Sequence, residues 1–483
     1  MSGSLKEDVL KVEILKVDIC VIGGGSGGLS VAAGAVQMGA SVVLVEKAEM
    51  GGDCLNTGCV PSKALLAAGE KAQAVRDADA FGIQTGVQTT DWAAVHKHVH
   101  AVIAAIAPND SVERFEGLGV QVIQAAGEFI DSRTLRAGDT TIRAKYFVIA
   151  TGSSPFVPPI DGLDTVDYFT NENIFDNQQQ VDHLVVIGGG PIGMEMAQAH
   201  RRLGAKVTVM EMARLLPKDD AELTKIVIDK LAEEGIVFYE GGRDLRFEKT
   251  DEGIAAYCAT DAGKQCAHGS HVLISTGRRA NVNGLNLQAA GVKYSPRGID
   301  VDARLRSSNK RIYAIGDVAG PYQFTHMAAY QAGIVIRNML FKLPAKVDYS
   351  AVPWVTYTDP ELAHVGMTEA DAEKAGKEVR VLRWSFAEND RAQAERRTEG
   401  LIKVITAKNG RIIGASIVGL HAGELIQAWV LAISQHMKIG AMAGMIAPYP
   451  TLAEANKRIA GSFYTSSLFS DRVRRIVRFL MRF

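Results

Sequence analysis

The chain has 483 residues, with 53 Lys and Arg against 54 Asp and Glu, and 47% of its residues are hydrophobic. A length of this order corresponds to about three domains of ~150 residues, and the balanced charge excludes the basic excess of a nucleic-acid-binding protein. No run reaches about 18 apolar residues, so we expect no membrane-spanning helix, and the charges scattered through the first residues predict no secretory signal. Five cysteines are too few for a disulfide framework. They favour a reducing, cytoplasmic setting in which any disulfide is catalytic or redox-sensing.

The first glycine-rich turn follows a short apolar run at 17–22 and precedes an alanine-rich stretch that is expected to be helical. A second predicted strand ends at Glu46, so the order strand, turn, helix, strand predicts a βαβ unit. In such a unit Gly23 makes the tight turn, Gly25 lets the backbone approach a pyrophosphate, and Gly28 lets helix and strand pack closely. The terminal acid can accept hydrogen bonds from a ribose.

The same unit recurs at 183–211, where Gly188, Gly190 and Gly193 repeat the glycine pattern and Glu211 ends the second strand. One glycine-rich turn is weak evidence, but two copies with the same flanking strands, helix and acid are strong evidence. The sequence therefore predicts two dinucleotide sites in two domains.

Two cysteines, Cys54 and Cys59, are separated by four residues and precede a predicted helix over 64–74. Thiols near a helix N-terminus have a lowered pKa and are better nucleophiles. A zinc site would need two further ligands at suitable spacing, and none lies nearby. Two inert structural cysteines are the other alternative. The position directly after the first nucleotide unit favours a redox-active dithiol beside a nucleotide cofactor, and no metal site is predicted.

The stretch 51–63, G-G-D-C-L-N-T-G-C-V-P-S-K, resembles the active-site segment of the FAD-dependent pyridine nucleotide–disulfide oxidoreductases of class I. That family includes dihydrolipoamide dehydrogenase, glutathione reductase and mercuric reductase. The resemblance runs from about Val17 to about Arg458 and includes further motifs at 150–152, 275–278, 312–317 and 352–369. It implies an α/β fold with two Rossmann-like dinucleotide-binding domains and a C-terminal α+β dimerisation domain.

The predicted domains follow the order of these motifs. We expect residues 1–155 and 283–348 to form the two parts of an FAD-binding domain, the first part carrying the cysteine pair. Residues 156–282 are expected to bind NAD(P)H. Residues 349–483, with strand-like runs and a predicted helix at 423–435, are expected to form the dimerisation domain of a homodimer.

The resemblance assigns cofactor contacts position by position. For FAD they are Gly23, Gly25, Gly28, Glu46, Gly52, Thr151, Gly152 and Asp317, the last towards the ribityl chain. For the nicotinamide dinucleotide they are Gly188, Gly190, Gly193, Glu211 and Gly277. An acid at 211 accepts a hydrogen bond from a ribose 2′-hydroxyl and repels a 2′-phosphate, which favours NADH over NADPH. Arg214, three residues on, would weaken that preference.

The resemblance also implies the chemistry. Cys54 would be the interchange thiol that meets substrate, and Cys59 would face the flavin as the charge-transfer thiolate. Lys63 would lie near the flavin and pair with Glu195, although a lysine at a helix start is by itself usually solvated. A helix expected to begin at Thr325 would point its positive end at the flavin.

The C-terminal motif departs from the family's disulfide reductases. Those enzymes end with His-Pro-Thr-x-x-Glu, whereas this chain has Tyr449 in the place of the histidine and retains Glu454. Histidine is largely a free base at neutral pH, while tyrosine, with a pKa near ~10, is not. Tyr449 is therefore expected to act as a hydrogen-bond donor or acid that, with Glu454, completes the partner's site. Mercuric reductases share the tyrosine, but they usually carry a C-terminal cysteine pair, which residues 478–483 lack.

Together these features predict an NADH-dependent FAD oxidoreductase that passes electrons through Cys54 and Cys59 to a small disulfide or a lipoyl group. The alternatives are a metal-ion reductase of the mercuric type and a redox-sensing or electron-carrier flavoprotein with slow turnover.

The tail carries a separate feature. Apolar residues at 473, 476, 477 and 480 follow helical spacing among five arginines. Such a basic amphipathic helix can pack on protein or make peripheral contact with an anionic membrane, and both readings stay open.

Overall fold

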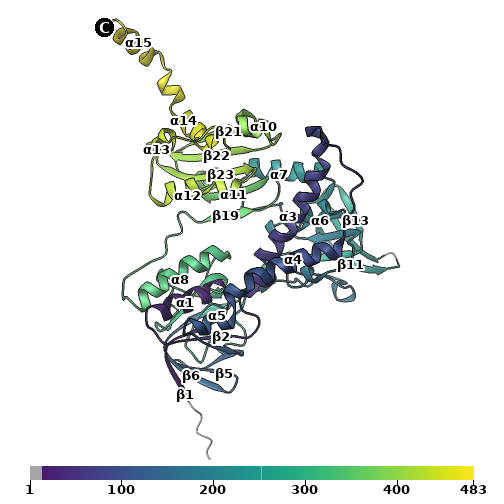
Figure 1. Cartoon of the computed structure of the whole chain (residues 1–483), viewed down its shortest axis with the longest axis vertical. Helices are drawn as coiled ribbons and strands as arrows, with labels where there is room; N and C mark the ends of the chain where they lie inside the picture. Colours follow the sequence, from purple (N-terminus) through teal and green to yellow (C-terminus); the bar gives the residue numbers. More distant parts are fainter. Residues whose placement is uncertain (1–13, 252) are drawn as a thin grey trace, which may run out of the picture.

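The computed structural model describes residues 14–251 and 253–483. The first 13 residues, within the segment expected to carry no secretory signal, lie outside this range. The α/β fold class is confirmed. The first sheet is mostly parallel, with an antiparallel edge formed by β5 (Thr134–Ala137) and β4 (Gly127–Asp131), the second is parallel, and an antiparallel sheet lies near the C-terminus. Figure 1 shows the three sheets in separate parts of the molecule, with the C-terminal one nearest to the end of the chain.

The first parallel sheet is built around β1 (Ile14–Ile22), which pairs in parallel with β2 (Val42–Glu46) and β6 (Thr140–Ile149). Helix α1 (Ser26–Gln37) connects β1 to β2, as a βαβ unit requires. A late segment completes this domain, because β18 (Ile312–Ala314) pairs in parallel with β6. Helix α8 (Thr325–Met339) packs beside α1 (Figure 1).

The second parallel sheet has the order β10-β9-β8-β14. Its strands β8 (His183–Ile187) and β9 (Lys206–Met210) are joined by α6 (Pro191–Arg202), which repeats the βαβ unit. An antiparallel sheet, β11-β12-β13, is appended to this domain. The remaining elements named here are β10 (Ile236–Tyr239), β14 (His271–Ile274), β11 (Arg243–Thr250), β12 (Gly253–Thr260) and β13 (Gly263–Gly269).

Two helices connect the nucleotide-binding domains at the cysteine pair. The short α2 (Gly52–Asn56) is followed by the long α3 (Cys59–Arg76), which packs on α6 of the second domain. Side chains of α3, α4 (Trp92–Ile106) and α6 share one hydrophobic core. The cysteine-bearing segment is therefore held from both nucleotide domains.

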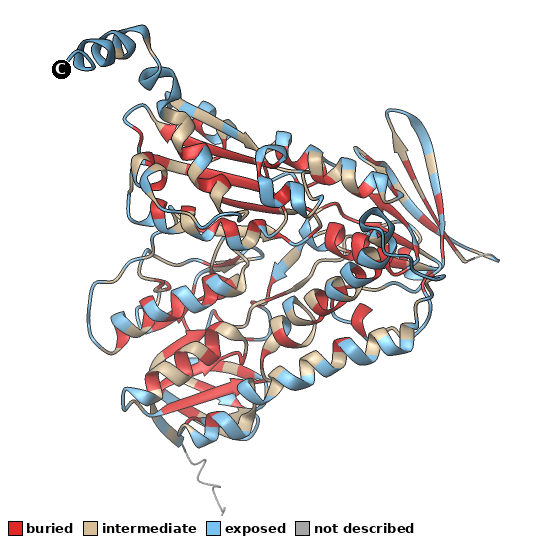
Figure 2. Cartoon of the chain, turned by 45° about the horizontal axis from the view of Figure 1, so that its top comes forward, coloured by how far each residue is buried: buried red, intermediate tan, exposed pale blue. Residues whose placement is uncertain are grey.

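The C-terminal domain is a five-stranded antiparallel sheet of order β19-β20-β23-β22-β21. Figure 2 shows its central strands buried. The expected single helix at 423–435 is interrupted at Ile426, because the Trp429 N–H bonds to the Ile426 carbonyl only three residues back. The strands are β19 (Pro353–Thr356), β20 (Glu361–Gly366), β21 (Val379–Ser385), β22 (Leu401–Ala407) and β23 (Ile412–Gly419), and the helices are α10 (Asp390–Ala394), α11 (Ala422–Leu425), α12 (Gln427–Ser434), α14 (Glu454–Leu468) and α15 (Asp471–Leu480).

No helix among the described residues is both long and apolar enough to cross a membrane.

Candidate functional site

In the first glycine turn, Gly23 and Gly28 lie so close to neighbouring backbone that neither position has room for a side chain. Gly23 has φ +109°, and a Cβ on it would lie 2.3 Å from the Ala150 carbonyl oxygen. A Cβ on Gly28 would lie 1.8 Å from the Gly23 oxygen, so α1 can approach β1 only with glycine there. At Gly25, in contrast, the nearest atom to a Cβ would be 3.9 Å away, which leaves open space in front of the helix N-terminus. This space suits a phosphate group.

The second turn repeats this geometry. A Cβ on Gly188 would lie 2.5 Å from the Ser275 oxygen, and one on Gly193 would lie 2.0 Å from the Gly188 oxygen. Gly190 has no atom within 4 Å of its Cβ position, as at the corresponding Gly25. The two domains thus present the same open helix N-terminus.

The acids at the ends of β2 and β9, Glu46 and Glu211, hold the loops around them. Each carboxylate accepts one backbone N–H from the glycine turn and one from two residues after the acid, so it fixes both loops. A carboxylate oxygen has two acceptor sites, so both acids can still accept from a ribose hydroxyl. The donors are Gly24 and Ala48 at 2.7 Å for Glu46, and Gly189 at 2.6 Å and Ala213 at 2.7 Å for Glu211.

Arg214 is engaged by its own loop. Its guanidinium donates to the carbonyl oxygens of Pro217 and Asp219, both at 3.0 Å. An arginine that recognises a 2′-phosphate must present free donors to it. Both bonds use Nη2, however, so Nε and Nη1 keep their donors, and the expectation that Arg214 weakens the preference for NADH stays a prediction.

The cysteine pair is positioned by two adjacent helices. Cys54 lies in α2, Cys59 is the first residue of α3, and both are free thiols. The hydrogen bond from Cys54, followed by the hydroxyl of Thr325 and the charge of Lys63, lowers the pKa of Cys59 to about 6, although burial opposes this. The same hydrogen bond and burial raise the pKa of Cys54. At neutral pH the negative charge therefore resides on Cys59 and the proton on Cys54.

Thr325 extends this arrangement in a way that the sequence did not reveal. Its Oγ1 lies 3.4 Å from the Cys59 Sγ, so the first residue of α8 touches the thiolate directly. The predicted helix start at Thr325 is confirmed, but nothing in the spacing of residues 266 positions apart indicated this contact.

Lys63 and Glu195 are brought together from two domains. The Lys63 Nζ lies 2.7 Å from Glu195 Oε2, and Glu195 is only 5% exposed. Burial disfavours the charged ammonium, but the charge and hydrogen bond of Glu195 outweigh it and raise the pKa of Lys63. Tyr357 joins the pair, since its backbone N–H donates to Glu195 Oε1 at 2.9 Å and its ring lies 4.4 Å from Nζ. Sequence analysis missed Tyr357, although it lies within the 352–369 motif.

Arg278 links one of the other expected cofactor residues to the cysteine segment, since its guanidinium lies 3.1 Å from Asp53 and 3.9 Å from Asp317. Asp317 accepts a hydrogen bond from Ser153 at 2.6 Å, and burial raises the pKa of its carboxyl. Thr151 donates to the Asn281 carbonyl oxygen at 2.7 Å. The glycines beside them have the positive φ that favours glycine, at Gly52 (+61°), Gly152 (+66°) and Gly277 (+125°).

A cavity of about 410 Å³ lies in front of the α1 N-terminus. Its lining includes Ser26, Gly51, Cys54, Arg114 and Thr325. It thus extends from the first glycine turn to Cys54. The open space at Gly25, the carboxylate of Glu46 and the partly buried Asp317 are chemically suited to hold FAD.

Tyr449 and Glu454 lie at the C-terminal domain and do not contact the cysteine pair of the same chain. The Tyr449 hydroxyl donates to Asp390 of α10 at 2.8 Å, and Tyr449 is 68% exposed. This hydrogen bond and the charge of Asp390 raise the pKa of Tyr449. Glu454 pairs with Arg458 at 2.7 Å instead of with Tyr449. Asp390 was not predicted, because no motif marks it.

Comparison with known proteins agrees with this geometry. The family model described as pyridine nucleotide-disulphide oxidoreductase matches residues 17–332, and the model for the dimerisation domain of the same family matches residues 352–460.

Similar curated proteins carry two different names. A mercuric reductase of Streptomyces lividans is 37% identical over 454 residues, covering 92% of this chain and 96% of the relative. A dihydrolipoyl dehydrogenase of Thermus scotoductus is 34% identical over 469 residues, covering 93% and 98%. Among solved structures, LpdA of Mycobacterium tuberculosis superposes with a TM-score of 0.84 at 26% identity, covering 92% of this chain and all of the other.

Proposed function

The chain belongs to the pyridine nucleotide-disulphide oxidoreductase family, and we propose that it uses NADH to reduce a small disulfide or a lipoyl group through Cys54 and Cys59. The observation that carries this proposal is the pair of free thiols on two adjacent helices, with the Cys59 sulfur 3.4 Å from the Thr325 hydroxyl and the nearby Lys63 held 2.7 Å from Glu195. Members of the family use FAD and NAD(P)H, and the dimerisation domain supports a homodimer. The cytoplasmic setting expected from the sequence stays a prediction.

When bound, FAD supplies two-electron transfer between NAD(P)H and the cysteine pair. The residues placed to hold it are the first glycine turn with Glu46, Asp317 and the segment around Gly52. Lys63, held by Glu195 and the ring of Tyr357, supplies a fixed positive charge next to Cys59. That charge adds to the Cys54 hydrogen bond and the Thr325 hydroxyl in lowering the pKa of Cys59.

The thiol chemistry balances within the pair. The sulfur of Cys54 attacks the substrate disulfide and displaces one substrate thiol, which leaves with the proton of Cys54. The Cys59 thiolate then attacks the Cys54 sulfur, forms the Cys54–Cys59 disulfide and displaces the second substrate sulfur as a thiolate. In the homodimer, Tyr449 of the partner subunit would serve as the hydrogen-bonding group that passes the proton.

NADH is the preferred donor in this proposal. Glu211 directly follows β9 and carries a carboxylate, which would accept from a ribose 2′-hydroxyl and repel a 2′-phosphate. This charge supports the unphosphorylated dinucleotide.

A second candidate is the reduction of a soft metal ion, and one observation favours it. Tyr449 donates to Asp390 and has a raised pKa, so it is not a base at neutral pH. Thiolate capture of a soft ion such as Hg(II) does not require such a base. The names of similar proteins include mercuric reductase and dihydrolipoyl dehydrogenase and so support both candidates.

The deciding experiment is an anaerobic NADH titration of the FAD-loaded dimer, followed by mixing with lipoamide, glutathione disulfide and Hg(II) in parallel. Rapid reoxidation by one of the disulfides supports the proposal, and rapid reoxidation only by Hg(II) supports the second candidate. If no acceptor reoxidises the protein faster than oxygen or a quinone, both are wrong and a redox-sensing or electron-carrier role remains.

A further inference from the structure

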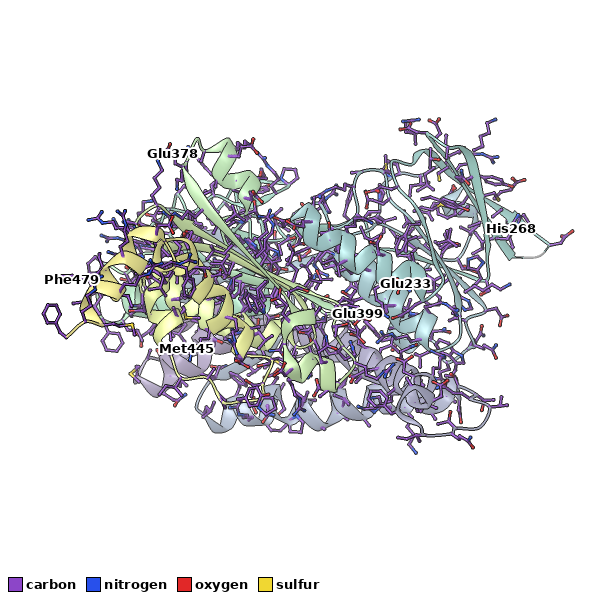
Figure 3. The ribbon with its side chains drawn as sticks, turned by 90° about the horizontal axis from the view of Figure 1, so that it is seen from above. Glu233, His268, Glu378, Glu399, Met445 and Phe479 are labelled. Carbon is purple, nitrogen blue, oxygen red and sulfur yellow. The ribbon has the colours of Figure 1, made fainter. Side chains whose placement is uncertain are left out.

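Helix α15 (Asp471–Leu480) stands apart from the rest of the molecule. None of its residues is buried, and its apolar side chains are open, with Ile476 49%, Leu480 61% and Phe483, just beyond the helix, 97% exposed. Figures 1 and 2 show it projecting from the end of α14, beyond the C-terminal domain and away from both nucleotide-binding domains. In Figure 3 the ring of Phe479 points outward at the edge of the molecule. The fold therefore leaves this helix without a packing partner in its own chain.

The helix has two chemically distinct faces. Val473, Ile476, Val477 and Leu480 follow the spacing i, i+3, i+4 and i+7, so they form one continuous apolar stripe. Arg474, Arg478 and Arg482 follow at intervals of four, and together with Arg475 they occupy the opposite face. Leu468 and Phe469, immediately before the helix, add further exposed apolar surface at 56% and 60%.

The charge on the helix is almost uncompensated. Residues 471–483 hold five arginines and one acidic side chain, Asp471. Within the described part of the chain, the only ion pair of these arginines joins Arg474 to Asp471 at 3.8 Å. The guanidinium groups flanking the apolar stripe thus remain available to an external anionic surface.

We propose that α15 is a membrane-surface anchor that lies in the plane of an anionic phospholipid bilayer, with its apolar stripe among the acyl chains and its arginines at the lipid phosphates. An apolar face opposite a basic face fits the surface of an anionic bilayer, where acyl chains lie beneath negatively charged phosphates. Ten residues extend only about 15 Å, half of the ~30 Å hydrocarbon core, so the helix lies along the surface and does not cross it.

A second copy of the same helix is a poorer partner. Two α15 helices packed through their stripes would bring ten arginines together with two acidic side chains. Because like charges repel, this excess of positive charge would oppose the packing of two α15 helices. Helix α15 also projects from the side of the C-terminal domain that faces away from α3, whose first residue is Cys59 (Figure 1). This inference does not depend on which acceptor the dithiol reduces.

The test is co-sedimentation of the full-length, FAD-loaded protein with vesicles of phosphatidylglycerol and phosphatidylcholine, compared with vesicles of phosphatidylcholine alone. We expect at least tenfold stronger binding to the anionic vesicles, and weaker binding as salt is raised, because counter-ions screen the arginines. Two variants separate the contribution of the charge to vesicle binding from that of the apolar stripe. Arg474→Gln with Arg478→Gln and Arg482→Gln removes charge, while Ile476→Ser with Leu480→Ser removes the stripe, and each is expected to lower binding at least tenfold.

The matched control neutralises three exposed lysines elsewhere, Lys249→Gln, Lys264→Gln and Lys293→Gln, and should leave vesicle binding unchanged. NADH oxidation and FAD content verify that each variant is folded. Equal binding to both vesicle types, or equal loss with the lysine control, overturns the proposal. Absence of vesicle binding combined with a change of oligomeric state in the stripe variant also overturns it and assigns α15 to a protein contact. Leu480→Trp reports membrane insertion without removing the apolar stripe. If the helix lies among the acyl chains, brominated lipids should quench the fluorescence of the added tryptophan.

Discussion

Tyr449 donates its hydroxyl hydrogen to the carboxylate of Asp390 at 2.8 Å, 59 residues earlier in the chain. The acceptor stabilises the neutral phenol and raises its pKa. Glu454, which the sequence motif places close to residue 449, is instead paired with Arg458. The carboxylate that holds the Tyr449 hydroxyl is therefore Asp390 and not Glu454.

Replacing Tyr449 by histidine should raise lipoamide reduction near neutral pH if disulfide turnover is limited by the missing base. Histidine is mostly neutral and basic at pH 7, whereas tyrosine is protonated, and general acid–base catalysis typically contributes about 10²-fold or more. Tyr449→Phe is the control, because it removes the hydroxyl and keeps the ring. Steady-state rates with lipoamide and with Hg(II) distinguish the candidates. An unchanged lipoamide rate in Tyr449→His would show that the base is not what limits this activity.

The second prediction concerns Cys59. In the two-electron-reduced enzyme its thiolate should produce a long-wavelength absorption band next to the flavin. The pKa of Cys59 is lowered to about 6, so the band should be present above that pH and fade as the pH falls through it. Cys59→Ser should abolish the band. A spectral pH titration measures both effects.

Cys54→Ala tests the cause of that low pKa. It removes the hydrogen bond that contributes most to the shift, so the thiolate of Cys59 should titrate at a higher pH than in the parent. Cys266→Ser, at an exposed thiol in the second nucleotide-binding domain, is the control and should change nothing. A band that persists in Cys59→Ser would assign the thiolate to another residue.

The sequence was informative where function depends on local spacing. Both βαβ units, with strands at His183–Ile187 and Lys206–Met210, could be read from glycine turns and apolar runs, since a steric constraint acts on a few neighbouring residues. Contacts between distant segments could not be predicted from the sequence. The Thr325 hydroxyl beside Cys59, the ring of Tyr357 over Lys63 and the Tyr449–Asp390 bond each join residues from separate elements, and only the packing of the domains brings them together. Arg214 is a related case, because the sequence shows a charge but not the carbonyl groups that bind it.

The nucleotide preference gives a third prediction. Glu211→Gln should narrow the preference for NADH over NADPH, because it removes the negative charge that repels a 2′-phosphate. The amide oxygen can replace only one of the two carboxylate oxygens that accept from Gly189 and Ala213, so thermal stability is measured alongside. Arg214→Ala should sharpen the preference for NADH, because it removes the Nε and Nη1 donors from which a 2′-phosphate could accept. The measurement is kcat/KM with each dinucleotide. An unchanged preference in Arg214→Ala would show that the guanidinium takes no part in binding the dinucleotide.

The last prediction separates binding from folding at the second glycine turn. A Cβ at Gly190 meets no protein atom within 4 Å, so Gly190→Ala should fold with unchanged stability. The methyl group would occupy the space that a pyrophosphate needs at the α6 N-terminus. We expect KM for NADH to rise by roughly tenfold or more, which corresponds to about 1.4 kcal/mol, with no loss of FAD.

Gly193→Ala should act differently, because its Cβ would lie 2.0 Å from the Gly188 oxygen and force the helix away from the strand. Its thermal stability should fall together with NADH binding. Gly333→Ala is the matched control on the exposed side of α8, where no atom lies within 4 Å, and it should keep NADH binding intact. An unchanged KM in Gly190→Ala would place the dinucleotide elsewhere and would remove the basis for assigning the second turn to NADH.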